Sequence, residues 1–115
     1  MSVTHVFASI PVADLDAAVA WYERFLGRSP DLIPNDSEAA WRVTETGWIY
    51  VVADPSRVGS SYCTLLVDDI DAFVSGCLER GVASDPVETM ADVGVRRTTI
   101  TDPDGNRIQV GQPPS

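Results

Sequence analysis

Apolar residues in this chain follow a strand-like pattern and then a helical pattern, and this order occurs twice. Apolar strand segments at 5–12 and 62–67 are each followed by apolar residues at helical spacing, at 12–27 and 67–81. The helical stripes consist of Leu15, Ala18, Val19, Tyr22 and Leu26 in the first segment, and of Ile70, Phe73, Val74, Cys77 and Leu78 in the second. Each half therefore predicts a strand followed by an amphipathic helix that packs on a sheet.

The two helical segments are copies of one another. "VADLDAAVAWYERFLG" and "VDDIDAFVSGCLERG" align at a constant offset of 55 residues, from Val12 onto Val67. An Asp stands at the predicted start of each helix, and Gly27 or Gly81 follows its end, as expected for helix caps. The alignment indicates a duplicated structural unit.

Each predicted helix is followed by a hairpin, at 41–52 and at 97–110, and the turn-rich segment 53–61 links the halves. Aligning the hairpins places Tyr50 on Gln109, an offset of 59 residues. We therefore predict an α+β fold in which two βαβββ modules form one curved eight-stranded mixed sheet with a helix outside each half. Residues 1–115 are expected to be a single domain, with module 1 at about 4–54 and module 2 at about 60–112.

This duplicated pattern, with "PVADLDAAVAWYERFLG" and "TDPDGNRIQV" as its strongest elements, resembles the vicinal oxygen chelate superfamily. That superfamily includes glyoxalase I, extradiol dioxygenases and bleomycin resistance proteins. The resemblance runs from His5 to Gln112. It implies the glyoxalase/bleomycin resistance fold, with a cup-shaped site inside the sheet that a second subunit often completes.

The resemblance also implies four positions at which metal-using members carry a ligand: Phe7, Tyr50, Tyr62 and Gln109. A divalent ion needs several His, Glu, Asp or Cys donors, and of these four positions only Gln109, through its amide oxygen, is a plausible donor. His5 shares the face of Phe7 but lies about 7 Å further along the strand. We therefore expect no metal and no cofactor. The alternative is a divergent metal-dependent lyase, isomerase or dioxygenase that uses Gln109, His5 or Tyr62.

The same positions suit an organic ligand. We predict that Phe7, Trp41, Tyr50, Tyr62 and Gln109 line the cup, with Trp41 opposite Tyr50 across the hairpin and Trp48 on the same side of its strand as Tyr50. Rings with a few polar tips fit a flat aromatic molecule, and their faces attract cations. A cup filled by its own rings is the alternative.

The net charge of the chain indicates which kinds of binding partner are favoured. Seventeen acidic residues against eight arginines and no lysine give a net charge of −9. Such a field repels nucleic acid and anionic membranes and favours a cationic ligand. An inward-facing Arg42, Arg97 or Arg107 would instead pair with an anionic one. No signal peptide or membrane-spanning stretch is recognisable, and Cys63 and Cys77 fit reduced core positions, so a cytoplasmic location is expected.

The leading hypothesis is a metal-free small-molecule binding protein, similar to bleomycin resistance proteins and homodimeric, that holds an aromatic, optionally cationic, ligand in the cup. A protein–protein module, in which the sheet is only a dimer scaffold, is the third alternative after the metal enzyme.

Overall fold

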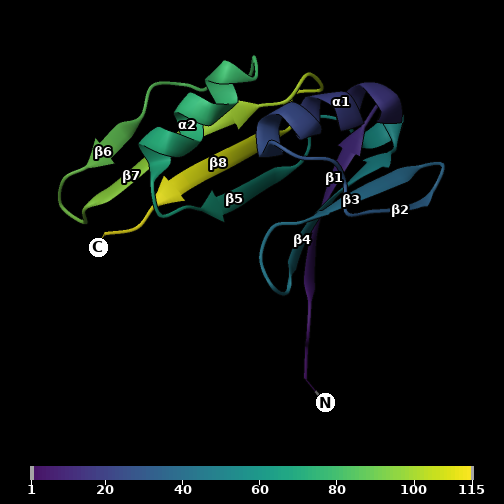
Figure 1. Cartoon of the computed structure of the whole chain (residues 1–115), viewed down its shortest axis with the longest axis horizontal. Helices are drawn as coiled ribbons and strands as arrows, with labels where there is room; N and C mark the ends of the chain where they lie inside the picture. The colour runs from purple at the N-terminus through teal and green to yellow at the C-terminus, as the bar shows by residue number, and fades with distance from the viewer. Residues whose placement is uncertain (1, 115) are drawn as a thin grey trace.

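The computed structural model describes residues 2–114 and contains the two predicted βαβββ modules in succession (Figure 1). The first module consists of β1 (Val6–Val12), α1 (Leu15–Leu26), β2 (Leu32–Asn35), β3 (Glu38–Arg42) and β4 (Gly47–Ala53). A short 3₁₀ helix, η1 (Pro55–Arg57), lies in the link. The second module consists of β5 (Tyr62–Leu66), α2 (Ile70–Glu79), β6 (Glu88–Met90), β7 (Val95–Thr101) and β8 (Arg107–Gln112).

Both helices begin as the capping pattern predicts. The side chains of Asp14 and Asp69 accept hydrogen bonds from the backbone amides three residues later, at 3.2 and 3.1 Å. Gly27, at the end of α1, has a φ of 78° and donates its amide to Glu23 O. This left-handed conformation favours glycine, so the residue ends the helix and turns the chain towards β2.

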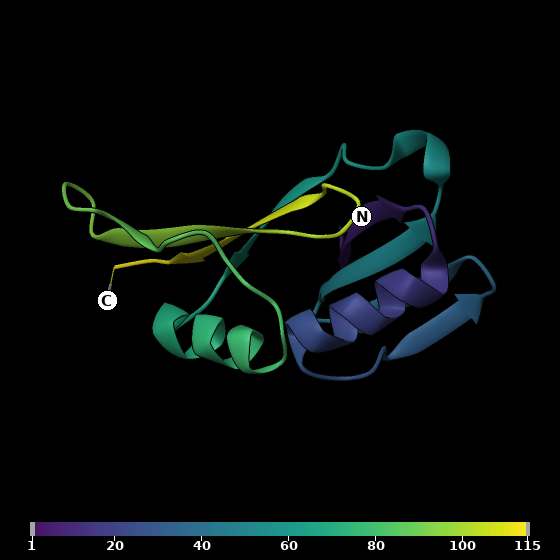
Figure 2. The ribbon, with the colours of Figure 1, turned by 90° about the horizontal axis from the view of Figure 1, so that it is seen from above.

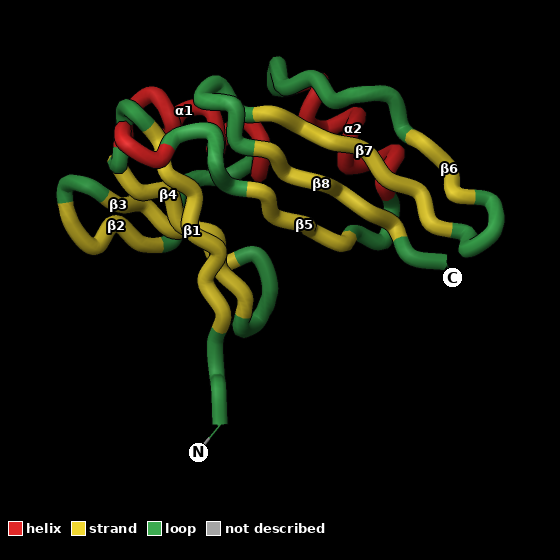
Figure 3. The backbone as a smooth tube through the Cα atoms, turned by 180° about the vertical axis from the view of Figure 1, so that it is seen from behind, coloured by secondary structure: helices red, strands yellow, loops and turns green. Residues whose placement is uncertain are grey.

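The eight strands are divided between two four-stranded mixed sheets of equivalent order, β1-β4-β3-β2 and β5-β8-β7-β6 (Figure 3). Within residues 2–114 no hydrogen-bonded strand pair joins the two sheets. The central pairs are parallel, and their registers repeat: Phe7 pairs with Trp48, and the equivalent Tyr62 pairs with Arg107. The α+β class and the duplicated module are thus confirmed, and the eight strands form two four-stranded sheets where a single eight-stranded sheet was predicted.

Each sheet has one face against a helix and one open face. In Figure 2 both helices lie on the same side of the strands that they cover. The helix side holds the core, whose largest fully buried side chains are Trp41, Tyr22, Phe25, Ile10, Ile49, Ile70, Ile100 and Ile108. Side chains alternate between the two faces along each strand. The positions between the buried core residues, such as Phe7 on β1 and Tyr50 on β4, therefore lie on the open face.

The "TDPDGN" turn between β7 and β8 joins the modules through a buried polar cluster. Asp102 accepts hydrogen bonds from the Tyr22 hydroxyl at 2.8 Å and from the Asn106 amide side chain at 2.9 Å. Asn106 also donates to Pro11 O at 2.8 Å, and its side-chain oxygen accepts from the backbone amides of Gly59 and Ser61. This motif therefore ties α1, β1 and the link to the second module.

Among the described residues, no helix has both the length and the apolar character needed to cross a membrane.

Candidate functional site

The open face of the first module carries an aromatic cluster of Phe7, Trp48 and Tyr50. The ring of Phe7 is stacked on that of Trp48, with centroids 5.4 Å apart and planes 16° apart. Tyr50 meets Phe7 edge to face at 5.8 Å. The parallel pairing of β1 with β4 creates this cluster, because it brings Phe7 beside Trp48 and the neighbouring Ser9 beside Tyr50. Phe7 remains 49% exposed, so the cluster presents ring surface to a ligand.

The open face of the second module is polar. The guanidinium of Arg107 lies 4.9 Å above the ring of Tyr62, which is its register partner. Gln109 occupies the next open-face position on β8, and its side-chain oxygen accepts a hydrogen bond from Thr64 at 3.4 Å. Arg97 on β7 lies 3.8 Å from the carboxylate of Glu88. A pocket of about 230 Å³ brings Tyr62, Gln109, Arg97 and Glu88 together.

Four of the five predicted lining residues therefore lie on the open faces, whereas Trp41 does not. The prediction that Trp41 lies opposite Tyr50 is wrong: Ala40 pairs with Tyr50, and Trp41 pairs with Ile49. Trp41 is fully buried on the helix side, where its indole N–H donates to Arg28 O at 2.9 Å. The amides of Val43 and Thr44 both donate to Gly47 O. These two hydrogen bonds close the hairpin with a loop of five residues instead of the predicted four. A one-residue shift of this kind reverses the face of every side chain on a strand.

Trp48 takes the place expected for Trp41. It is partly buried, stacks on Phe7 and pairs across the sheet with Arg42. The alternation of side chains along β4 already places Trp48 on the face of Tyr50, so this residue could be found from the sequence.

The four positions that correspond to metal ligands do not make a metal site. Phe7 has no donor atom, Tyr50 and Tyr62 offer only phenols, and Gln109 offers one amide oxygen. Within residues 2–114 no group of three or more His, Cys, Asp or Glu side chains converges in a way that could hold an ion. The His5 ring contacts the neighbouring Thr4 hydroxyl at 3.0 Å. These residues do not fit a divalent metal.

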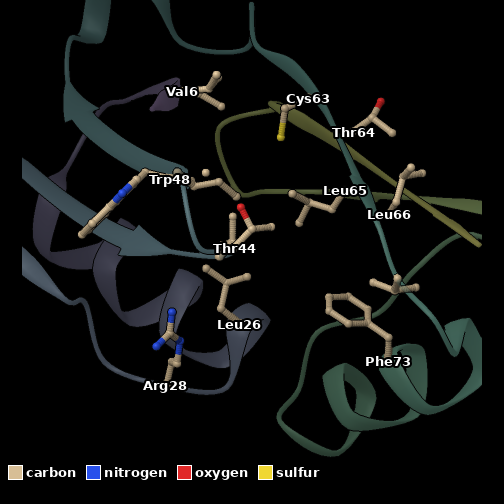
Figure 4. A pocket seen from close by; sticks show the side chains of 15 residues that line it. Val6, Leu26, Arg28, Thr44, Trp48, Cys63, Thr64, Leu65, Leu66 and Phe73 are labelled. Atoms are coloured by element: carbon tan, nitrogen blue, oxygen red, sulfur yellow. The ribbon is translucent and has the colours of Figure 1, made fainter. Parts of the chain in front are cut away.

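A larger apolar pocket of about 520 Å³ lies between the modules (Figure 4). Val6 and Ala8 line it from β1, Cys63 and Leu65 from β5, and Phe73 from α2. These residues of β1 and β5 lie on the opposite strand face from Phe7 and Tyr62, but Trp48 of the aromatic cluster also lines the pocket (Figure 4). Burial raises the pKa of the Cys63 thiol, which keeps it a neutral, packing side chain.

Two βαβββ modules with parallel central strand pairs and one open sheet face each define the glyoxalase-like class of folds. The chain belongs to the Glyoxalase/Bleomycin resistance protein/Dioxygenase superfamily, whose family model matches residues 2–110. The resemblance drawn from the sequence motifs is therefore confirmed. No curated protein shows significant similarity to the chain.

Several solved structures share the whole architecture. A glyoxalase/bleomycin resistance protein from Catenulispora acidiphila is 42% identical, with a TM-score of 0.91 over 97% of this chain and 100% of that one. TnmS3, an antibiotic binding protein from Streptomyces sp. CB03234, is 28% identical, with a TM-score of 0.77 over 98% of each chain. A bleomycin-binding protein in complex with bleomycin is 20% identical, with a TM-score of 0.76 over 97% of this chain and 98% of that one.

Proposed function

We propose that the protein binds a planar aromatic organic molecule on the open sheet faces, without a metal and without changing it chemically. The observation that carries this proposal is the aromatic cluster of Phe7, Trp48 and Tyr50 on the sheet face opposite α1. Tyr62 and Gln109 supply the polar part of the site. Trp48 replaces Trp41 in the proposed lining.

Two features favour ligand binding rather than a cup that is filled by its own aromatic side chains. Phe7 and Tyr62 are 49% and 53% exposed, so ring surface is free for stacking. The similar structures also include an antibiotic binding protein and a bleomycin-binding protein with bleomycin bound. Stacking on exposed rings combined with a few polar contacts is the common chemistry of sites for flat organic molecules.

The proposal is tested with 2-naphthylacetamide, a neutral flat probe, by isothermal titration calorimetry. Trp48→Ala is expected to weaken its binding about tenfold, equivalent to about 1.4 kcal/mol, because stacking surface is lost. Leu78→Ala is the control, since Leu78 is an exposed apolar residue on α2, away from the open faces. Treatment with EDTA is expected to leave the affinity unchanged.

Absence of binding by the unmodified protein, or equal effects of the two substitutions, would overturn the proposal. Binding that EDTA abolishes would instead favour the metal-dependent alternative.

We further propose a homodimer in which a second copy packs into the apolar pocket between the modules. Exposed apolar side chains border this pocket, with Val6 65% and Leu66 70% exposed. Apolar surface of this kind marks association sites in small proteins. Arg28 is the one charged residue in its lining, so two chains that each carry −9 meet there without close carboxylate repulsion.

Sedimentation velocity tests the dimer. Leu66→Glu is expected to shift the protein to monomer, because it would bury an unpaired carboxylate at the interface. Leu78→Glu adds the same charge at a similarly exposed position on α2 and is expected to leave the dimer intact. A monomeric unmodified protein, or dissociation by both substitutions alike, would contradict the proposed interface.

A further inference from the structure

The two halves of the open face correspond through the repeat but differ in chemistry. The Phe7–Trp48 pair of the first sheet is equivalent to the Tyr62–Arg107 pair of the second, by the offsets of 55 and 59 residues. An aromatic stack in one half therefore corresponds to a guanidinium over a ring in the other. The repeat has produced two places of similar geometry, one for a ring and one for a polar group.

The same difference continues along the strands. Tyr50 is equivalent to Gln109. Their partners on the adjacent strands, Ala40 and Thr99, are equivalent as well. At the next open-face position, Glu38 is equivalent to Arg97. The second half therefore offers an amide, a hydroxyl and a second guanidinium around the Tyr62 ring.

Charge on the open face does not follow the charge of the chain. Among the described residues, the open-face strand positions hold three of the eight arginines, Arg42, Arg97 and Arg107, and two of the 17 acidic residues, Glu38 and Glu88. Asp85, from the loop before β6, also lines the pocket that contains Arg97. Salt screens exposed charges more than about 8 Å apart at physiological ionic strength. The charges close to the ligand, rather than the net charge of −9, therefore govern which ligand charge is favoured, and the position of Arg107 relative to the nearby carboxylates becomes decisive.

Arg107 is available to a ligand. Its side chain is exposed and lies over the Tyr62 ring, and among the described residues no carboxylate lies within ion-pair distance of it. A guanidinium stacked on a ring keeps its N–H groups at the edges, where they can donate two parallel hydrogen bonds to a carboxylate. Arg97 contributes from β7, where its 3.8 Å separation from Glu88 is too long for a hydrogen bond.

One of the contacts between the modules lies close to both open faces. The Ser61 hydroxyl donates to Ser9 O at 3.3 Å. Ser61 immediately precedes Tyr62, and Ser9 is two positions from Phe7 on the same strand. This contact brings the strand of Phe7 next to the start of the strand of Tyr62, so the aromatic cluster and the arginines lie on either side of it.

We infer that the ligand class is a planar aromatic molecule that carries a carboxylate, with its ring on Phe7 and Trp48 and its carboxylate on Arg107. This inference rests on the proposed function and specifies the ligand's charge. It replaces the expectation of a cationic ligand, which followed from the net charge and from the attraction of ring faces for cations.

The test compares three probes with the same ring and different charge: 2-naphthylacetate, 2-naphthylacetamide and 2-(2-naphthyl)ethylamine. Calorimetry at pH 7.5 is expected to give the acetate at least a tenfold higher affinity than the amide, and the amine the lowest. Arg107→Gln is expected to weaken the acetate about tenfold and the amide much less, because a neutral amide oxygen gains less from the guanidinium charge than a carboxylate does. Arg24→Gln is the matched control, because it makes the same change in net charge on the exposed surface of α1.

An amine that binds as tightly as the acetate overturns the inference but leaves the proposed function standing. The same holds if Arg107→Gln and Arg24→Gln weaken the acetate equally, since the effect would then come from the overall charge. If none of the three probes binds, the proposed function fails and the inference fails with it.

Discussion

Asp102→Ala is expected to lower the free energy of unfolding by about 3 kcal/mol or more, measured by urea denaturation. Asp102 is 4% exposed and accepts four hydrogen bonds. Its removal would leave the Tyr22 hydroxyl and the backbone amides of Asp104 and Asn106 without their acceptor. Each such buried donor costs about 1–3 kcal/mol, and water entering the space would offset part of the loss.

The Tyr22 hydroxyl can be relied on as a donor in this cluster. Burial and the neighbouring Asp102 carboxylate raise the pKa of Tyr22 far above its ordinary value. The phenol therefore keeps its proton throughout the range in which the protein would be studied, and the loss caused by Asp102→Ala should not depend on tyrosine ionisation.

Asp104→Ala provides the control for this prediction. Asp104 lies in the same turn, but it is partly exposed, and its side chain accepts one hydrogen bond, from the Ala13 amide at 3.2 Å. Its replacement is expected to cost about 1 kcal/mol or less. Equal losses from the two substitutions would mean that the buried cluster does not hold the modules together.

Trp41→Ala is expected to cost about 3–5 kcal/mol in the same measurement. Trp41 is fully buried, and its indole N–H donates to Arg28 O. The centroids of the Trp41 and Tyr22 rings are 5.9 Å apart. The substitution would leave a cavity between α1 and the sheet and an unpaired carbonyl. A loss of this size is a large fraction of the roughly 6–17 kcal/mol expected for a chain of 115 residues.

Trp48→Ala separates the two faces of the sheet. Trp48 is partly exposed and stacks only on the open face, so its replacement is expected to cost less than about 1.5 kcal/mol while it weakens ligand binding. A greater loss of stability from Trp48→Ala than from Trp41→Ala would show that the faces have been assigned the wrong way round. If Trp41→Ala does not fold, Trp41→Phe keeps most of the volume and tests the same position.

The sequence alone determined the fold class, because local and repeated signals agree along the chain. Asp14 and Asp69 cap helices, Gly27 and Gly81 follow the helix ends with φ values of 78° and 87°, and the offset between the halves reproduces the strand registers. Each of these features depends on short-range geometry or on the comparison of one half with the other. The family resemblance followed from the same positions.

Only the tertiary structure decided which tryptophan reaches the site. Trp41 and Trp48 flank one hairpin, and the assignment of Trp41 depended on whether the loop takes four residues or five. Loop length is set by hydrogen bonds from Val43 and Thr44 to Gly47, which alternation of side chains does not reveal. Alternation within β4 was sufficient for Trp48, because there no loop intervenes.

The local charge of the site was also decided by the tertiary structure. Composition supplies a net charge of −9, whereas strand pairing places Arg42, Arg97 and Arg107 on the open face and most carboxylates elsewhere. A sum over the chain carries no information on position, and the interactions of a ligand are governed by the few charges within a screening length. The sequence therefore determined the fold and the aromatic character of the site, and the pairing of distant strands determined which side chains meet there.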